Sequence, residues 1–197
     1  MTRALQAAVT GLAVGLLVMI AALELGGGSP QPALPGIPDA GPLVGWALPA
    51  TTYLVRLAAV AVTGFLVAAV FLMPTGKDVV EGLSVSAVGL ASRWAAVWSV
   101  ASLVLFFLTM ADVFATPLSG LSSTSVTSFA FEASVGRALL VQAVVAAVLA
   151  VACRWTIGVR PLAVWAGVSL AALLPVSLTG HSASAGSHDL ATTSLFR

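Results

Sequence analysis

The sequence predicts an all-α integral membrane protein: a bundle of about five transmembrane helices, with the start of a sixth at the C-terminus. Of its 197 residues, 59% are hydrophobic and 8% are charged, whereas a soluble domain carries about 25% charged residues. The mean hydropathy is +1.09, and apolar runs of about 20 residues, long enough to cross a bilayer, recur along the chain. Composition therefore predicts one polytopic membrane domain over residues 1–197, with the lipid bilayer as its surroundings.

The first predicted span covers residues 5–25, with Arg3 before it and Glu24 near its end. A cleaved signal peptide is the competing interpretation. Because the run is long and no clear small-residue cleavage motif precedes the glycines at 26–28, we expect a retained transmembrane helix. Residues 26–49 are expected to form a loop, since repeated prolines and glycines leave no uninterrupted helical stretch there.

The other four spans are predicted at residues 51–73, 91–111, 137–153 and 161–178. A Pro-Thr-Gly turn ends the second span, and the polar connection after it could continue as a short interfacial helix as far as Ser86. A loop rich in serine and threonine is expected from Thr116 to Ser128. Residues 190–197 turn apolar again, like the first two turns of a sixth helix.

Most basic residues fall on one side of the membrane if five spans alternate: Arg3, Lys77, Arg93, Arg154 and Arg160. The opposite loops contain no lysine and have only Arg137 near their edges. Lys and Arg concentrate in cytoplasmic loops. We therefore expect a multi-pass protein of the plasma membrane with a cytoplasmic N-terminus and an extracytoplasmic polar segment at 179–189.

That polar segment, residues 179–189, holds both histidines of the chain, His181 and His188, followed by Asp189. Imidazole suits copper, zinc, iron and nickel, and a flexible Gly/Ser segment could bring both rings to one ion with Asp189 as an added oxygen donor. On a helix the same spacing would put the rings about 10 Å apart, too far for one ion. Two solvated loop histidines are the alternative. Met110 is a candidate thioether ligand for Cu(I), with ordinary apolar packing as its alternative.

Arg56 is the most informative single charge, because a charge inside a span is costly and usually has a partner or faces a wet interior. One expectation is an ion pair with a carboxylate near the outer face: Glu24, Asp112, Glu132 or Asp189. Another is a polar vestibule, formed by Arg56 with Asp112 and Glu132, that leads to the histidine segment. Snorkelling to the outer headgroups is a third possibility.

The sequence gives little support for nucleic-acid binding, cysteine chemistry or catalysis. A net charge of +1 argues against a nucleic-acid partner, and the single cysteine, Cys153, permits no internal disulfide and no Cys-pair metal site. The chain shows no phosphate-binding loop and no nucleophile paired with a base. We therefore predict a protein that is not an enzyme.

Several motifs resemble one family. Leu178-Thr179-Gly180-His181, followed by Gly186-x-His188-Asp189-Leu190-Ala191, closely resembles the CopD copper-resistance family. Similar stretches lie at residues 35–41, 69–74 and 136–142, so the resemblance covers most of the chain. The form it resembles most is the actinobacterial fusion of a CopD-type region to a CtaG-type cytochrome c oxidase assembly region.

The resemblance implies copper handling or transport at the plasma membrane, with His181 and His188 as ligands and a possible link to cytochrome c oxidase assembly. In the family the next helix begins with a further histidine and continues through a Trp-x-Gly-Gly motif. The chain is therefore expected to be an N-terminal piece of a longer protein. Its expected partners are the remaining CopD/CtaG-type helices or a membrane partner protein.

Two other functions stay open at this point. One is a structural or assembly subunit that docks into a larger membrane complex and has no metal of its own. The other is a haem-binding bundle, which two histidines on facing helices would favour, although both histidines here follow one helix.

Overall fold

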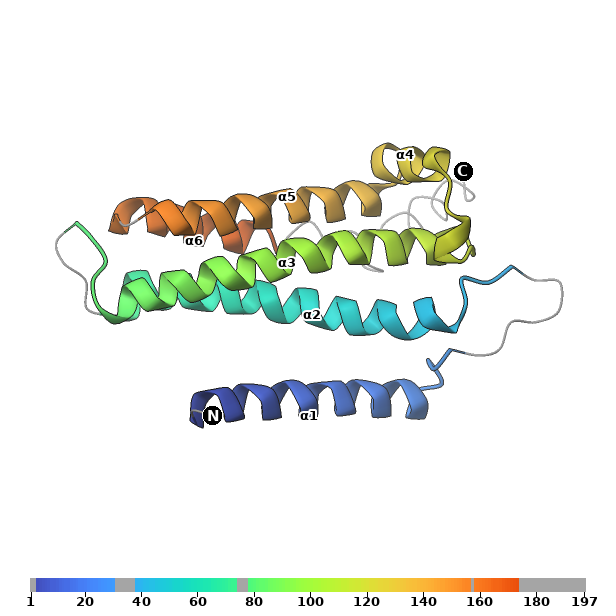
Figure 1. Ribbon diagram of the computed structural model, residues 1–197, viewed down its shortest axis with the longest axis horizontal. Helices are drawn as coiled ribbons and strands as arrows, with labels where there is room; N and C mark the ends of the chain where they lie inside the picture. The colour runs from blue at the N-terminus through green and yellow to red at the C-terminus, as the bar shows by residue number, and fades with distance from the viewer. Residues whose placement is uncertain (1–2, 31–37, 74–77, 157, 174–197) are drawn as a thin grey trace, which may run out of the picture.

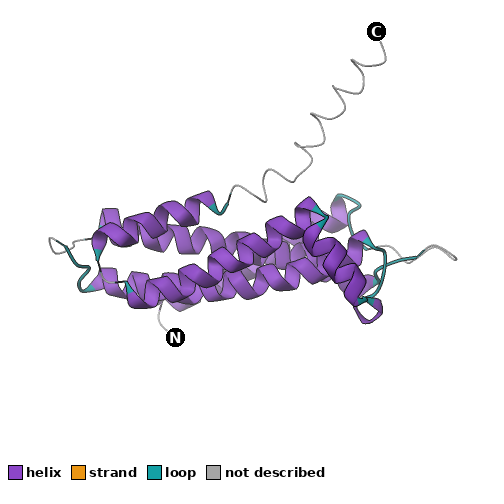
Figure 2. Cartoon of the chain, turned by 90° about the horizontal axis from the view of Figure 1, so that it is seen from above, coloured by secondary structure: helices purple, strands orange, loops and turns teal. Residues whose placement is uncertain are grey.

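The computed structural model describes residues 3–30, 38–73, 78–156 and 158–173, and the named elements among them are helices (Figures 1 and 2). They are α1 (Arg3–Leu25), α2 (Pro42–Val67), α3 (Leu83–Val113), α4 (Ser123–Phe131), α5 (Ser134–Trp155) and α6 (Val159–Ala171). Three helices are long and apolar enough to cross a membrane: α2 with its extension to Leu72, α3 and α5. Shorter apolar stretches lie in α1 and α6. The predicted all-α membrane bundle is confirmed.

The second helix begins at Pro42, nine residues before the predicted start, so the expectation of a loop through residue 49 is wrong. Pro42 lies in the first helical turn, where a missing N–H leaves no intrahelical bond unmade. Pro49 lies inside the helix, and prolines are more frequent in membrane helices than in soluble ones. The helix continues as a π-helical turn, η1 (Ala68–Leu72), and Met73 is extended, as expected for a residue that precedes proline.

The third helix begins at Leu83, eight residues before the predicted start, and takes in the stretch expected as a separate interfacial helix. The loop expected at 116–128 contains a short 3-10 turn, η2 (Leu118–Gly120), and the beginning of α4. Ser122 caps α4, since its hydroxyl accepts a hydrogen bond from the Ser125 N–H at 3.1 Å. Serine is unfavourable within helices but favourable at this capping position, which is why composition alone predicted a loop.

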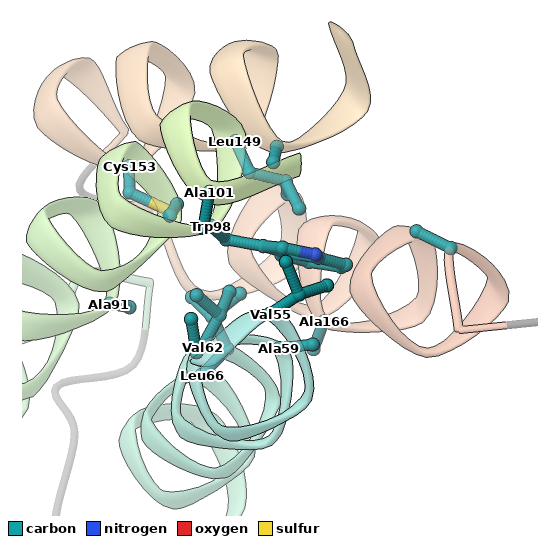
Figure 3. Packing of buried hydrophobic residues seen from close by; sticks show 14 of the residues in the cluster. Val55, Ala59, Val62, Leu66, Ala91, Trp98, Ala101, Leu149, Cys153 and Ala166 are labelled. Atoms are coloured by element: carbon teal, nitrogen blue, oxygen red, sulfur yellow. The ribbon is translucent and has the colours of Figure 1, made fainter. Parts of the chain in front are cut away.

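Helices α2, α3, α5 and α6 form the bundle, in which α3 packs extensively on both α2 and α5 (Figure 1). The core surrounds Trp98 of α3, whose side chain is fully buried. Val62 of α2, Leu149 of α5 and Ala166 of α6 belong to the same buried cluster (Figure 3). One large aromatic ring therefore joins all four helices of the bundle.

Two hydrogen bonds connect α3 to α5. The Ser92 hydroxyl donates to the Ala150 carbonyl at 2.7 Å, and the Ser99 hydroxyl donates to the Ala143 carbonyl at 2.9 Å. The two serines and the two acceptors are each seven residues apart, so both bonds lie on one antiparallel seam. Small side chains let membrane helices approach closely enough for such contacts.

Helix α1 lies at the edge of the molecule beside α2 (Figure 1). Its Gly15 lies against the ring of Tyr53 of α2, and a Cβ at that position would collide with the Tyr53 hydroxyl. Other side chains of α1, such as Leu17 and Val18, remain exposed in the described structure. The first helix is thus attached mainly through one close approach to α2.

Candidate functional site

The two ends of the bundle carry different charged residues. The end where α3 begins and α5 ends has three exposed arginines, Arg93, Arg154 and Arg160, and two exposed carboxylates, Asp78 and Glu81. The opposite end has exposed Asp112 at the end of α3, and exposed Glu132 and Arg137 around the start of α5. The basic residues therefore gather at one end of the bundle, as the alternation of spans requires. The side of the membrane that each end faces stays a prediction.

Three of the predicted site residues lie at the second end, but they do not form one cluster. Met110 is fully buried and belongs to the same hydrophobic cluster as Phe106 and Phe129. Asp112 is exposed, and exposed Glu132 accepts a hydrogen bond from the Ser128 hydroxyl at 2.6 Å. Met110 therefore has the environment of a packed apolar residue.

The histidine segment lies outside the described residues, which end at Leu173. The predicted ligands His181, His188 and Asp189 consequently have no structural description. Among the residues that are described, no group of three or more His, Cys, Asp or Glu side chains could hold a metal ion. The described helices alone do not supply a copper site.

Arg56 lies deeper in its helix than predicted. The span predicted at 51–73 would place Arg56 about one and a half turns after its start. In the structure α2 begins at Pro42, fourteen residues before Arg56. By helical rise this is about 21 Å, close to the midpoint of the 31-residue helix from Pro42 to Leu72. Arg56 forms no ion pair with any described carboxylate, Glu24, Asp112 and Glu132 included.

Arg56 lines a cavity of about 330 Å³ between the helices. Arg56 and Thr52 come from α2, Leu105 from α3 and Gln142 from α5, and Leu173 follows α6. The Thr52 hydroxyl already donates to the Leu48 carbonyl at 2.8 Å. Arg56 is exposed, so the buried polar side chain that the lining leaves for a guest is the Gln142 amide.

Gln142 is the functional candidate that sequence reasoning missed. Its side chain is 3% exposed, and its Oε1 has no hydrogen-bond partner among the described residues. A buried polar atom without a partner costs about 1–3 kcal/mol, so this acceptor calls for a ligand or a water in the cavity. The sequence did contain a signal for this residue: Gln142 is the one uncharged amide in the apolar run between Arg137 and Arg154.

The electrostatics of this cavity oppose a bare copper ion. A guanidinium offers donors and no acceptor, and its charge repels a monovalent cation at 4 Å by about 4 kcal/mol at an effective dielectric constant of 20. The residues here suit an anionic or neutral polar guest. The cavity has Arg56 but neither Asp112 nor Glu132 in its lining, so the vestibule expected from these three residues stays a prediction.

The protein is an apolar helical bundle of the membrane class, with a mostly apolar cavity that has Arg56 and Gln142 in its lining. Over residues 38–189 the chain matches the family model described as copper resistance protein D-like, N-terminal domain. No curated protein and no solved structure gives a significant match.

The chain belongs to the copper resistance protein D-like family, because the match covers well over half of its 197 residues. This confirms the resemblance seen in the sequence and makes the chain a membrane protein related to copper resistance. The matched range begins after α1 and ends at residue 189, so it includes both histidines.

Proposed function

We propose that this chain handles or transports copper at the extracytoplasmic face of the plasma membrane, with the N-terminus in the cytoplasm. One observation carries the proposal: the family match runs to residue 189 and so includes the whole segment with His181 and His188. These are the only two histidines of the chain, and imidazole is a suitable copper ligand. Copper is cargo here, and no covalent reaction is involved.

In this proposal His181 and His188 bind the ion, and Asp189 adds an oxygen donor. Met110 was also a candidate ligand, but its side chain is fully buried, so we expect the replacement Met110→Leu to leave copper affinity within about threefold. Replacement by leucine keeps the volume of the core nearly unchanged. A loss of copper binding in this variant would return Met110 to the ligand set.

The decisive experiment removes both imidazoles. The double variant His181→Ala/His188→Ala should lose stoichiometric copper binding, measured by metal analysis of the purified chain after equilibration with copper. A matched control, Ser182→Ala/Ser184→Ala, changes two polar residues of the same segment and should bind copper as the original chain does. Unchanged copper affinity in the histidine variant would refute the proposed ligands.

The alternative is a structural or assembly subunit that docks into a larger membrane complex and carries no metal of its own. Metal analysis separates the two functions, because a metal-free chain that co-purifies with a membrane partner would favour the subunit. A link to cytochrome c oxidase assembly rests on the sequence resemblance and stays a prediction.

A further inference from the structure

A second cavity, of about 310 Å³, lies at the basic end of the bundle, far from the histidine segment's predicted side. Arg93 of α3 and Arg154 of α5 both line it, together with Thr156. The rest of the lining consists of small and apolar residues: Val80, Val85, Val88, Gly89, Ser92 and Cys153. The cavity thus combines two guanidinium groups with an apolar surface.

The connections between the helices close this end. The segment before α3 forms an isolated antiparallel bridge with the segment before α6, between Val79 and Gly158, and the Val159 N–H donates to the Asp78 carbonyl at 3.1 Å. Val80, next to the bridge, is buried and lines the cavity. The cavity therefore has a defined floor that belongs to the fold.

The two arginines have no counter-ion in the described structure. Asp78 and Glu81, the described carboxylates of this end, are exposed, and neither forms an ion pair with Arg93 or Arg154. The nearby Ser92 hydroxyl is occupied by the Ala150 carbonyl at 2.7 Å. Two unpaired guanidinium groups at one cavity suit a phosphate group, whose oxygens match the planar fork of arginine donors.

The position along the helices indicates where that phosphate comes from. Arg93 lies twenty residues before the end of α3, and Arg154 lies twenty residues after the start of α5. In each case the distance is about 30 Å by helical rise, which is about the thickness of the hydrocarbon core of a bilayer. Both arginines therefore lie at the level where the core meets the headgroups.

One tryptophan marks the same level. Trp155 follows Arg154 and is 82% exposed, whereas Trp94, which follows Arg93, packs in part against the core. Exposed tryptophans concentrate at the membrane–water interface. Basic pockets between transmembrane helices on the cytoplasmic side are known to bind anionic headgroups, and this is the end predicted to face the cytoplasm.

We propose that the cavity between Arg93 and Arg154 binds the phosphate of an anionic phospholipid headgroup, with the valines of its lining against the first part of the lipid. The bound lipid joins the beginning of α3 to the end of α5. The site is separate from the proposed copper ligands, so neither proposal depends on the other.

The test titrates phosphatidylglycerol or phosphatidylcholine into the purified full chain in detergent and follows lipid adducts by native mass spectrometry, with thermal unfolding as a second readout. We expect phosphatidylglycerol to bind and stabilise, and Arg93→Gln/Arg154→Gln to weaken this binding about 30-fold, given the usual contribution of each arginine to anionic-lipid attraction. The control Arg137→Gln/Arg160→Gln removes the same charge from positions outside the cavity lining and should change binding less than about threefold.

Three results would overturn the proposal: equal binding of the two lipids, equal losses in the two double variants, or stabilisation by inorganic phosphate alone that matches phosphatidylglycerol. The last would assign the site to a free anion. If the glutamine variant does not fold, Arg93→Lys/Arg154→Lys keeps both charges but removes the planar forks. That variant should lose affinity while remaining folded, and an unchanged affinity would contradict arginine-specific phosphate binding.

Discussion

Helix α1 and the bundle of α2, α3, α5 and α6 are both strongly apolar, yet they are held in different ways. The bundle surrounds a fully buried Trp98 and is joined by hydrogen bonds from two serines of α3 to carbonyls of α5. The first helix rests on α2 through Gly15 and Tyr53, with most of its larger side chains exposed. The family match also separates them, because it begins at residue 38.

The difference shows that hydrophobicity does not decide which helices pack together in a membrane. Lipid tails are as apolar as leucine, so association depends on close packing and on interhelical hydrogen bonds. The bundle has many such contacts and α1 has few. Four groups of substitutions, ordered by expected effect, test whether stability follows packing in this way.

The largest loss is expected for Trp98→Ala in the bundle core. Removing a fully buried ring leaves a cavity among four helices, which we expect to cost about 3–5 kcal/mol of unfolding free energy. The matched control is Trp155→Ala, because Trp155 is 82% exposed, and it should cost less than about 0.5 kcal/mol. Unfolding in mixed detergent would measure both, and similar losses would mean that Trp98 is not the centre of the packing.

The next effect is expected at the tight corner between α4 and α5. A Cβ on Gly136 would collide with the backbone carbonyl of Phe129, which cannot move aside as a side chain can. Gly136→Ala should therefore cost about 1–3 kcal/mol. Gly167→Ala meets open space and should be neutral or stabilising by up to about 1 kcal/mol. An unchanged unfolding free energy in Gly136→Ala would show that the backbone at this corner can move to accommodate the added Cβ.

A smaller effect is expected for the serines of the seam. Ser92→Ala and Ser99→Ala each remove one interhelical hydrogen bond, and each should cost about 0.6 kcal/mol. Ser86→Ala, on the same helix but exposed, is the control and should have no measurable effect. If all three variants unfold alike, the hydrogen bonds are not what distinguishes the α3–α5 interface.

The smallest effect on the bundle is expected for Gly15→Leu in α1. The added side chain must push α1 away from Tyr53, so hydrogen exchange should rise in α1 while the unfolding free energy of the bundle changes by less than about 0.5 kcal/mol. Gly11→Leu is the matched control on the same helix, because a Cβ at Gly11 meets no atom within 4 Å. A large loss of bundle stability in Gly15→Leu would make α1 part of the core.

Much of the fold was predictable because long apolar runs report on helices directly. The starts of helices were less predictable. Pro42 begins a helix that proline content had assigned to a loop, and Ser122 caps a helix in a stretch whose composition predicts a loop. In both cases the residue type is ambiguous, since proline and serine favour loops and first turns alike.

The candidate site was less predictable, because burial and pairing are properties of the packed bundle. The sequence singled out Arg56 correctly as a charge within a helix, but its cavity partner Gln142 became visible only when α2, α3 and α5 were placed together. For Met110 the sequence left both a ligand and an apolar core residue open, and packing places it in the core. The copper ligands proposed at residues 181–189 lie outside the described residues and stay predictions.

The two serine bonds between α3 and α5 also limit how the protein can move. Because donors and acceptors both repeat every seven residues, a slide of α3 along α5 by one helical turn breaks both bonds and offers neither serine its old acceptor. Such a slide is therefore opposed by both bonds, at about 0.6 kcal/mol each. A rearrangement that opened the Arg56 cavity and kept both bonds would have to displace α2 or α6, and α6, with thirteen residues, is the shorter of these two helices.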